Sequence, residues 1–219
     1  MVSLPIFPLG TALMPGGNLP LQIFEPRYLQ LFAELTDKPV DQRRFGVIAL
    51  RRGIEVGPEA AVELHDVGCV ALVTRIRTIS GTRRLLVETR GTRRFHIEHL
   101  DPTAHTPYLC ADIEWLPEQP GACAAELDVL AEALAGALTA YRHALGAPAL
   151  VLTGTPAECS YAVADAMVLD TADRQRLLAA PTTADRLHLA RSLMRREEAL
   201  VSRLGALPRP VPLGEEARN

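Results

Sequence analysis

Residues 19–35, LPLQIFEPRYLQLFAEL, change within one stretch from a strand pattern to a helix pattern. The first part, Leu19–Phe24, is rich in large apolar residues and is predicted to be a strand. A helix is expected to begin at Pro26, because a proline at the first helical position gives up no hydrogen bond. Apolar residues then recur every three or four positions, at Tyr28, Leu29, Phe32 and Leu35. This spacing keeps one face of the helix against a sheet, so the stretch predicts a helix embedded in β structure.

Short β-like runs lie on both sides of this helix, up to about residue 117. Each run carries β-branched or aromatic residues between turn signals, which is typical of a small barrel or sandwich. The predicted strands are Leu4–Phe7, Leu19–Phe24, Phe45–Leu50, Val62–Ile79, Arg84–Arg90, Phe95–Leu100 and Cys110–Leu116. Two hairpin turns are predicted as well, at Ser80-Gly81 and at Arg90-Gly91, because glycine tolerates a positive φ.

The apolar period changes to three or four residues after the segment PEQPG at 117–121. A long amphipathic helix is expected from Leu127 to Leu145, where Gly146 ends it. A second helix is expected to begin after Thr155, with Glu158 closing a capping box, and to end near Asp170.

Two more helices are predicted in the C-terminal half. A short one covers Arg174 to Ala179, and a long one is capped at Thr182 with Asp185 three residues on. The apolar face of the long helix is predicted to carry Leu189, Leu193, Leu200 and Leu204. The sequence therefore indicates an α+β chain, with a β-rich part at 1–117, a helical bundle at 122–205 and a tail at 206–219. The tail is expected to be mobile, because it has three prolines and no apolar period.

The composition limits the partners and the compartment. A net charge of -3 gives no field over the whole chain that would draw it to nucleic acid or to an anionic membrane. No apolar stretch reaches the roughly 18 residues that a membrane span needs, and the start, MVSLPIFPLG, lacks the pattern of a signal peptide. The four cysteines form no C-x-x-C pair, which argues against a zinc site and a disulfide framework. We expect a cytoplasmic protein that does not act at a membrane.

Catalytic signatures are missing from the sequence. ATP hydrolysis by a P-loop needs G-x-x-x-x-G-K-[ST], and the single lysine, Lys38, lies in a turn before a proline. That position also makes it a poor partner for a nucleophilic serine. His96 and His99 are three apart on a predicted strand and so point to opposite faces unless a bulge intervenes. We predict no catalytic residue, no metal site and no cofactor.

Several segments together resemble the N-terminal domain of Lon proteases. They are LPIFPL at 4–9, LMPG at 13–16, LPLQIFEPRY at 19–28, FGV at 45–47, VGCVA at 67–71, RGTRRF at 90–95 and PYLCA at 107–111. The resemblance implies a PUA-like pseudo-barrel packed on a helical bundle, and a role in recognising unfolded or damaged polypeptides. The chain ends before an ATPase or a peptidase domain could begin, so we expect a stand-alone, non-catalytic recognition module or adaptor.

The resemblance and the local chemistry suggest where a polypeptide would bind. Arg27 and Tyr28 offer a charged and an aromatic group beside Phe24 and Glu25, although all four also have structural explanations at a strand end and a helix start. Leu13 and Met14 lie in a glycine-flanked loop, where a methionine can adapt to varied apolar partners or simply fill the core. The candidate polypeptide site is Leu13, Met14, Phe24, Glu25, Arg27 and Tyr28.

A second candidate surface is basic. Between Arg75 and Arg94 there are seven arginines and one acid, Glu88. PUA-like folds include RNA binders, and arginines on adjacent hairpins could follow the phosphates of RNA. They could also bind an acidic partner protein or be ordinary solvated charges. The residues of this alternative site are Arg75, Arg77, Arg83, Arg84, Arg93 and Arg94. A scaffolding role for the long helices is a third alternative.

Overall fold

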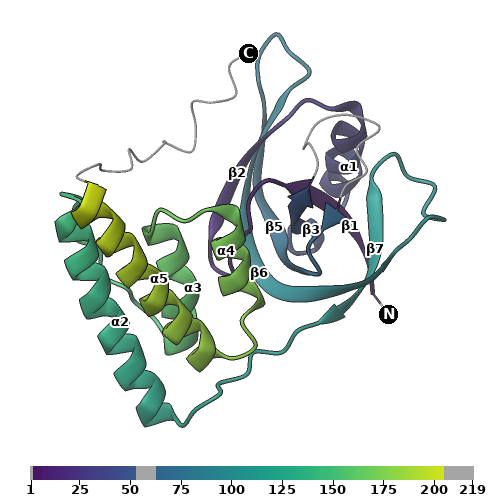
Figure 1. Cartoon of the computed structure of the whole chain (residues 1–219). Helices are drawn as coiled ribbons and strands as arrows, with labels where there is room; N and C mark the ends of the chain where they lie inside the picture. Colours follow the sequence, from purple (N-terminus) through teal and green to yellow (C-terminus); the bar gives the residue numbers. More distant parts are fainter. Residues whose placement is uncertain (1, 53–62, 205–219) are drawn as a thin grey trace.

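The computed structural model describes residues 2–52 and 63–204, which form a β barrel and a group of helices to one side of it (Figure 1). The strands are β1 (Val2–Leu9), β2 (Asn18–Ile23), β3 (Arg44–Arg52), β4 (Glu63–Leu64), β5 (Val67–Thr78), β6 (Leu85–Leu100) and β7 (Leu109–Trp115). The helices are α1 (Pro26–Thr36), α2 (Ala124–Ala144), α3 (Pro156–Ala166), α4 (Thr171–Ala179) and α5 (Thr183–Leu204), and a 3-10 turn covers Val40–Gln42. The expected α+β class, with β structure followed by helices, is confirmed. The tail predicted at 206–219 lies outside the described residues.

Five strands close the barrel. Neighbours pair in the order β1, β7, β6, β5 and β3, and β3 returns to β1 through parallel pairing of Ile6 with Gly46. β2 pairs with the first half of β6 and lies outside this ring. In the described ranges, no helix is long and apolar enough to cross a membrane.

The interior of the barrel is filled by apolar side chains, of which the Phe95 ring is the largest. The buried residues of this cluster are Leu4, Ile6, Ile48, Val70, Phe95, Ala111 and Ile113. A Cβ at Gly46 would lie 2.7 Å from Phe95 Cζ, and a Cβ at Gly68 would lie 2.6 Å from the Val47 carbonyl oxygen and collide with the same ring. The two glycines are therefore required, because a small barrel has room inside only for the side chains that fill it.

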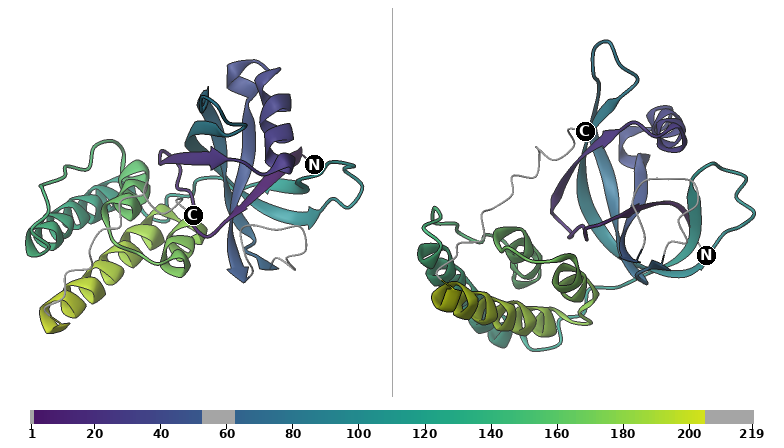
Figure 2. Two further views of the ribbon diagram at one scale, coloured as in Figure 1. Left: turned by 90° about the horizontal axis from the view of Figure 1, so that it is seen from above. Right: turned by 45° about the horizontal axis from the view of Figure 1, so that its top comes forward.

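The outer face of the barrel is covered by α1 and by the other helices, on different sides (Figure 2). On the α1 side, Tyr28 stacks on Phe7 with ring centroids 4.0 Å apart, and Phe32 meets Phe45 edge-on at 5.4 Å. The predicted start of α1 at Pro26 is confirmed, and its buried residues are Tyr28, Leu31, Phe32 and Leu35. The embedded helix thus forms an aromatic cluster with the barrel.

One of the two predicted hairpins is correct and the other is wrong. Ser80-Gly81 joins β5 to β6, and Gly81 has φ +75° as this turn requires. Arg90 and Gly91 lie inside β6, which is one long strand. Gly91 is needed there for a different reason, because a Cβ would collide with the carbonyl oxygen of Met14, whose loop crosses the strand.

The caps of the helices largely follow the sequence pattern. Thr155 and Glu158 form the predicted capping box of α3, and Thr182 Oγ1 accepts the N–H of Asp185 at the start of α5. α3 ends at Ala166 instead of near Asp170. Asp170 has another role, because its side chain caps α4 by accepting the N–H of Asp173.

The predicted apolar face of α5 is wrong in part. Leu193 is buried as expected, but Leu200 is 45% exposed and Leu189 is only partly buried. The side chain of Leu204 lies outside the described part of the chain. The buried stripe instead contains Arg186, Leu187, Ala190, Leu193 and Met194. The buried stripe includes an arginine because the first turn of α5 lies beside Glu118, Ser160 and Ala180, whose oxygen atoms accept from the Arg186 guanidinium.

Candidate polypeptide-binding surface

Two large apolar side chains are exposed next to each other where β2 and β6 pair. Phe24 is 48% exposed and Leu86 is 40% exposed. Leu86 lies opposite Gln22 on β2, and Phe24 follows directly after the end of β2, two residues beyond Gln22, so both side chains emerge on the same face. We call this face, with its neighbours Arg77, Arg84 and Glu88, the β2–β6 surface. An apolar centre with charges of both signs around it is the usual composition of a protein-binding surface.

The charged neighbours hold defined positions on the β2–β6 surface. The Arg84 guanidinium lies 5.9 Å from the centre of the Phe24 ring, within range of a cation–π contact. Arg77 Nη2 and Glu88 Oε1 form an exposed ion pair at 2.7 Å. Two arginines and one glutamate give this surface a small positive charge around the apolar pair.

The segment from Phe24 to Tyr28 divides between surface and core. Glu25 Oε2 and Arg27 Nη2 form an ion pair at 2.8 Å beside Phe24, and the Arg27 guanidinium lies 4.6 Å from the centre of the Tyr28 ring. Tyr28 itself is 4% exposed and stacks on Phe7. Glu25, Arg27 and Phe24 can thus contact a ligand directly, whereas Tyr28 supports them from below.

Leu13 and Met14 lie elsewhere, at the contact between the barrel and the helices. Both are buried, with 4% and 1% exposure. Their loop is held by Thr171 Oγ1, which donates to the Gly10 carbonyl, and by Arg174, which donates to the Ala12 carbonyl at 3.3 Å. The structure therefore does not bring Leu13 and Met14 together with Phe24. Both side chains pack in the core instead.

The arginines from Arg75 to Arg94 also separate into two places. Arg75, Arg77, Arg83 and Arg84 are exposed on the β5–β6 hairpin. Arg93 stacks over the Trp115 ring at 4.4 Å. Arg94 is buried, and its Nη1 donates to the carbonyls of Leu178 at 2.9 Å and Ala180 at 2.7 Å. Only the four hairpin arginines can form one basic surface.

A buried charged cluster joins the barrel to the helices. We call it the junction cluster; it consists of Arg94, Glu118, Ser160, Tyr161 and Arg186. Arg186 is fully buried, lies 3.7 Å from the centre of the Tyr161 ring and donates to Ser160 Oγ at 2.7 Å. Glu118 forms ion pairs with Arg186 and, at 3.7 Å, with Arg94, and it accepts the Tyr161 hydroxyl at 2.6 Å. No sequence pattern predicts this cluster, because its members are far apart in the chain.

The junction cluster shifts the acidity of its members. Burial by itself would raise the pKa of Glu118, but the hydrogen bond from Tyr161 and the charge of Arg186 outweigh it and hold the pKa below its ordinary value. Burial raises the pKa of the Tyr161 hydroxyl. At neutral pH Glu118 is therefore a carboxylate and Tyr161 donates to it.

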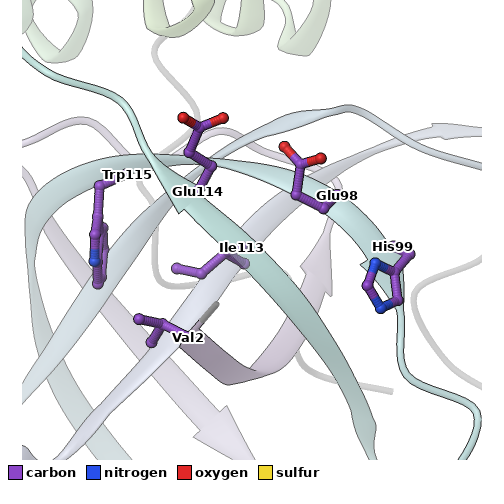
Figure 3. Close-up of a pocket in the computed structure, with 6 residues that line it drawn as sticks. All are labelled: Val2, Glu98, His99, Ile113, Glu114 and Trp115. Carbon is purple, nitrogen blue, oxygen red and sulfur yellow. The ribbon is translucent and has the colours of Figure 1, made fainter.

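A shallow pocket lies at β1, β6 and β7 and is shown in Figure 3. It has a volume of about 440 Å³ and is lined by Val2, Glu98, His99, Ile113, Glu114 and Trp115. The side chains of Val2, Ile113 and Trp115 lie on one side of the strands, and the carboxylates of Glu98 and Glu114 are directed away from them. The pocket can hold an apolar side chain of a ligand. The His99 Nε2 contacts Asp112 Oδ2 at 2.9 Å, and the described residues contain no group of three potential metal ligands.

Comparisons with known proteins agree with this architecture. The family described as "ATP-dependent protease La (LON) substrate-binding domain" matches residues 3–196. A comparison with curated protein sequences found no match.

Two solved structures show the same fold. The Lon N-terminal domain protein from Xanthomonas campestris is 22% identical, with a TM-score of 0.60 over 86% of this chain and 96% of that one. The N-terminal domain of the Mycobacterium avium complex Lon protease is 18% identical, with a TM-score of 0.67 over 89% of this chain and 98% of that one. At these identities the similarity establishes the fold and not the ligand.

Proposed function

This chain belongs to the family of Lon substrate-binding domains, and we propose that it binds exposed segments of unfolded polypeptide on the β2–β6 surface, without a catalytic step of its own. The observation that carries this proposal is the pair of exposed apolar side chains, Phe24 and Leu86, on one face. An unfolded segment exposes the apolar side chains that a folded protein buries, so burying Phe24 and Leu86 against such a segment is favourable. Folded proteins expose few such apolar segments, so they should bind this surface only weakly.

The charges around the apolar pair support a broad choice of segments. Arg77 and Glu88 neutralise each other, and so do Glu25 and Arg27. Arg84 adds a positive charge, so an acidic group in a ligand is attracted, while the two ion pairs keep the repulsion of a basic group small. We further propose that the protein acts in the cytoplasm, where its four free cysteines would remain reduced.

The test compares two apolar surfaces of the same chain. Phe24→Ser and Leu86→Ser should each weaken binding of a fluorescently labelled, reduced and carboxymethylated protein by about tenfold, because each removes apolar area that the complex buries. Val129→Ser is the matched control, since Val129 is 65% exposed on α2, away from the β2–β6 surface. Equal binding by Phe24→Ser, Val129→Ser and the unchanged protein would rule out this surface.

RNA is the second candidate ligand, and the four arginines of the β5–β6 hairpin favour it. Replacing Arg83 and Arg84 with glutamine would then abolish RNA binding, and RNA affinity would fall steeply with salt. Polypeptide binding through apolar contacts should change little over the same salt series. RNA binding that survives high salt, or that is unaffected by the two substitutions, would eliminate the hairpin as an RNA site.

A further inference from the structure

The backbone of β2 has one edge bonded to β6 and one edge directed away from it. Gly91 N donates to the Gly17 carbonyl at 2.8 Å, and Thr89 Oγ1 donates to the carbonyl of Leu19, which lies opposite it. In an antiparallel pair, alternate residues direct both backbone groups toward the partner strand. The odd-numbered residues of β2 therefore face β6, and Asn18, Pro20 and Gln22 face away.

The outward edge is accessible. Asn18 and Pro20 are exposed and Gln22 is partly buried. Across the ranges that the structure describes, β2 pairs with β6 and with no further strand. Figure 1 shows β2 at the margin of the barrel beside β6. The edge thus presents the N–H and C=O of Asn18 and Gln22 and the C=O of Pro20, spaced about 7 Å apart along the strand.

We propose that an extended polypeptide segment binds by adding a strand to this outward edge of β2. Donors and acceptors at every second residue match the backbone of an extended chain. The side chains of the added strand would alternate between the two faces of the sheet, and one set would lie beside Gln22 and Phe24, on the face that carries Leu86. This inference rests on the proposed function and specifies how the same surface binds its ligand.

The mode of binding explains how one site could accept many sequences. Backbone groups are the same in every unfolded segment, so the hydrogen bonds of an added strand do not depend on sequence. Pro20 has no N–H to offer, and a proline on an edge strand limits unselective pairing with other strands. The missing N–H weakens pairing with any added strand, and pairing between two copies of this edge would lose it on both strands.

Two substitutions in β2 should have opposite effects on the affinity for a synthetic peptide taken from the carboxymethylated protein. Gln22→Pro removes an outward N–H without removing a hydrogen bond to β6, and should weaken binding by about three- to tenfold, the value of one hydrogen bond. Pro20→Gln adds an outward N–H and should strengthen binding by a similar factor. Thermal unfolding of each variant checks that the fold is retained.

The unchanged protein provides a second test that does not depend on the variants folding. A peptide methylated on alternate backbone nitrogens keeps its side chains but loses the donors that face β2, so it should bind at least about tenfold more weakly in one of the two methylation registers. Hydrogen exchange at the amides of Asn18 and Gln22 should slow when the unmethylated peptide binds.

The outcomes separate the two proposals. Strand addition is wrong if Gln22→Pro binds the peptide as tightly as the unchanged protein does, and if both methylated peptides bind as tightly as the unmethylated one. If Phe24→Ser still weakens binding in that case, the β2–β6 surface remains the site. If the unmethylated peptide and its parent protein both fail to bind the unchanged chain, the proposed function itself is wrong.

Discussion

The interior of the barrel and the junction cluster are both buried, but they are built from opposite kinds of residue. The barrel interior is apolar throughout, with Phe95 resting over Gly46 and Gly68. The junction cluster buries two guanidinium groups against one carboxylate that is 38% exposed. An apolar core tolerates many combinations of side chains with a similar total volume. A buried charged group is stable only where a counter-charge and hydrogen-bond acceptors or donors lie next to it.

The barrel interior and the junction cluster therefore contribute to the fold in different ways. The barrel interior stabilises the β part through apolar area removed from water. The junction cluster ties the helices to the barrel, because Arg94 on β6 donates to the carbonyls of Leu178 and Ala180. Glu118 in the linker pairs with both Arg94 and Arg186 of α5. Both arginines donate to the carbonyl of Ala180 from different directions.

The largest expected effect is at the barrel interior. Phe95→Ala should lower the free energy of unfolding by about 3–5 kcal/mol, because it removes a fully buried ring and the two glycines beneath it cannot fill the space. Urea unfolding followed by tryptophan fluorescence measures it, with Trp115 as the probe. Phe24→Ala is the control, because Phe24 is half-exposed and should cost well under half as much. Equal losses for the two variants would contradict the assignment of the barrel interior.

A smaller effect is expected at the junction cluster. Glu118→Gln should lower the free energy of unfolding by about 1–3 kcal/mol, less than for a fully buried pair because the carboxylate is partly exposed. The loss arises because the buried Arg186 guanidinium loses its counter-charge. Glu114→Gln, at an exposed position of β7, should have almost no effect. If Glu114→Gln lowered the free energy of unfolding as much as Glu118→Gln, the loss could not be assigned to the ion pairs of Glu118.

The smallest effect is the dependence of the junction on pH. The pKa of Glu118 is lowered in the folded chain, so its contribution is fully present above its ordinary value of 4.5 and is lost as the pH falls through the folded pKa. The stability difference between the unchanged protein and Glu118→Gln should therefore shrink below about pH 4.5. The barrel interior has no ionisable side chain and should add nothing to this difference. A difference that stayed constant between pH 7 and pH 3.5 would contradict the lowered pKa.

Much of the fold was predictable, because the signals for it are local. The helix start at Pro26, the capping box of Thr155 and Glu158 and the turn at Gly81 each depend on residues within a few positions. The turn predicted at Arg90-Gly91 had the same local signal. It was wrong because Gly91 accommodates a loop from far away in the chain.

The candidate site was predictable only in part. Phe24, Glu25 and Arg27 lie together at the surface, whereas Leu13 and Met14 are buried. Leu86 was missed, although the alternation of Leu85, Leu86 and Val87 along a strand would have placed it on the face opposite its two neighbours. Its nearness to Phe24 could not be read in this way, because the pairing of β2 with β6 joins distant segments.

The sequence by itself determined the order of β and α structure, the embedded helix, most helix caps and the membership of the Lon-like family. These follow from periodicity, caps and motif segments, which depend on short-range chemistry. Only the tertiary structure decided that Arg94 and Arg186 are buried and that Arg83 and Arg84 are exposed. An arginine is stable in the interior only beside a carboxylate and free carbonyls, and here Glu118, Leu178 and Ala180 come from segments that meet only when the chain has folded.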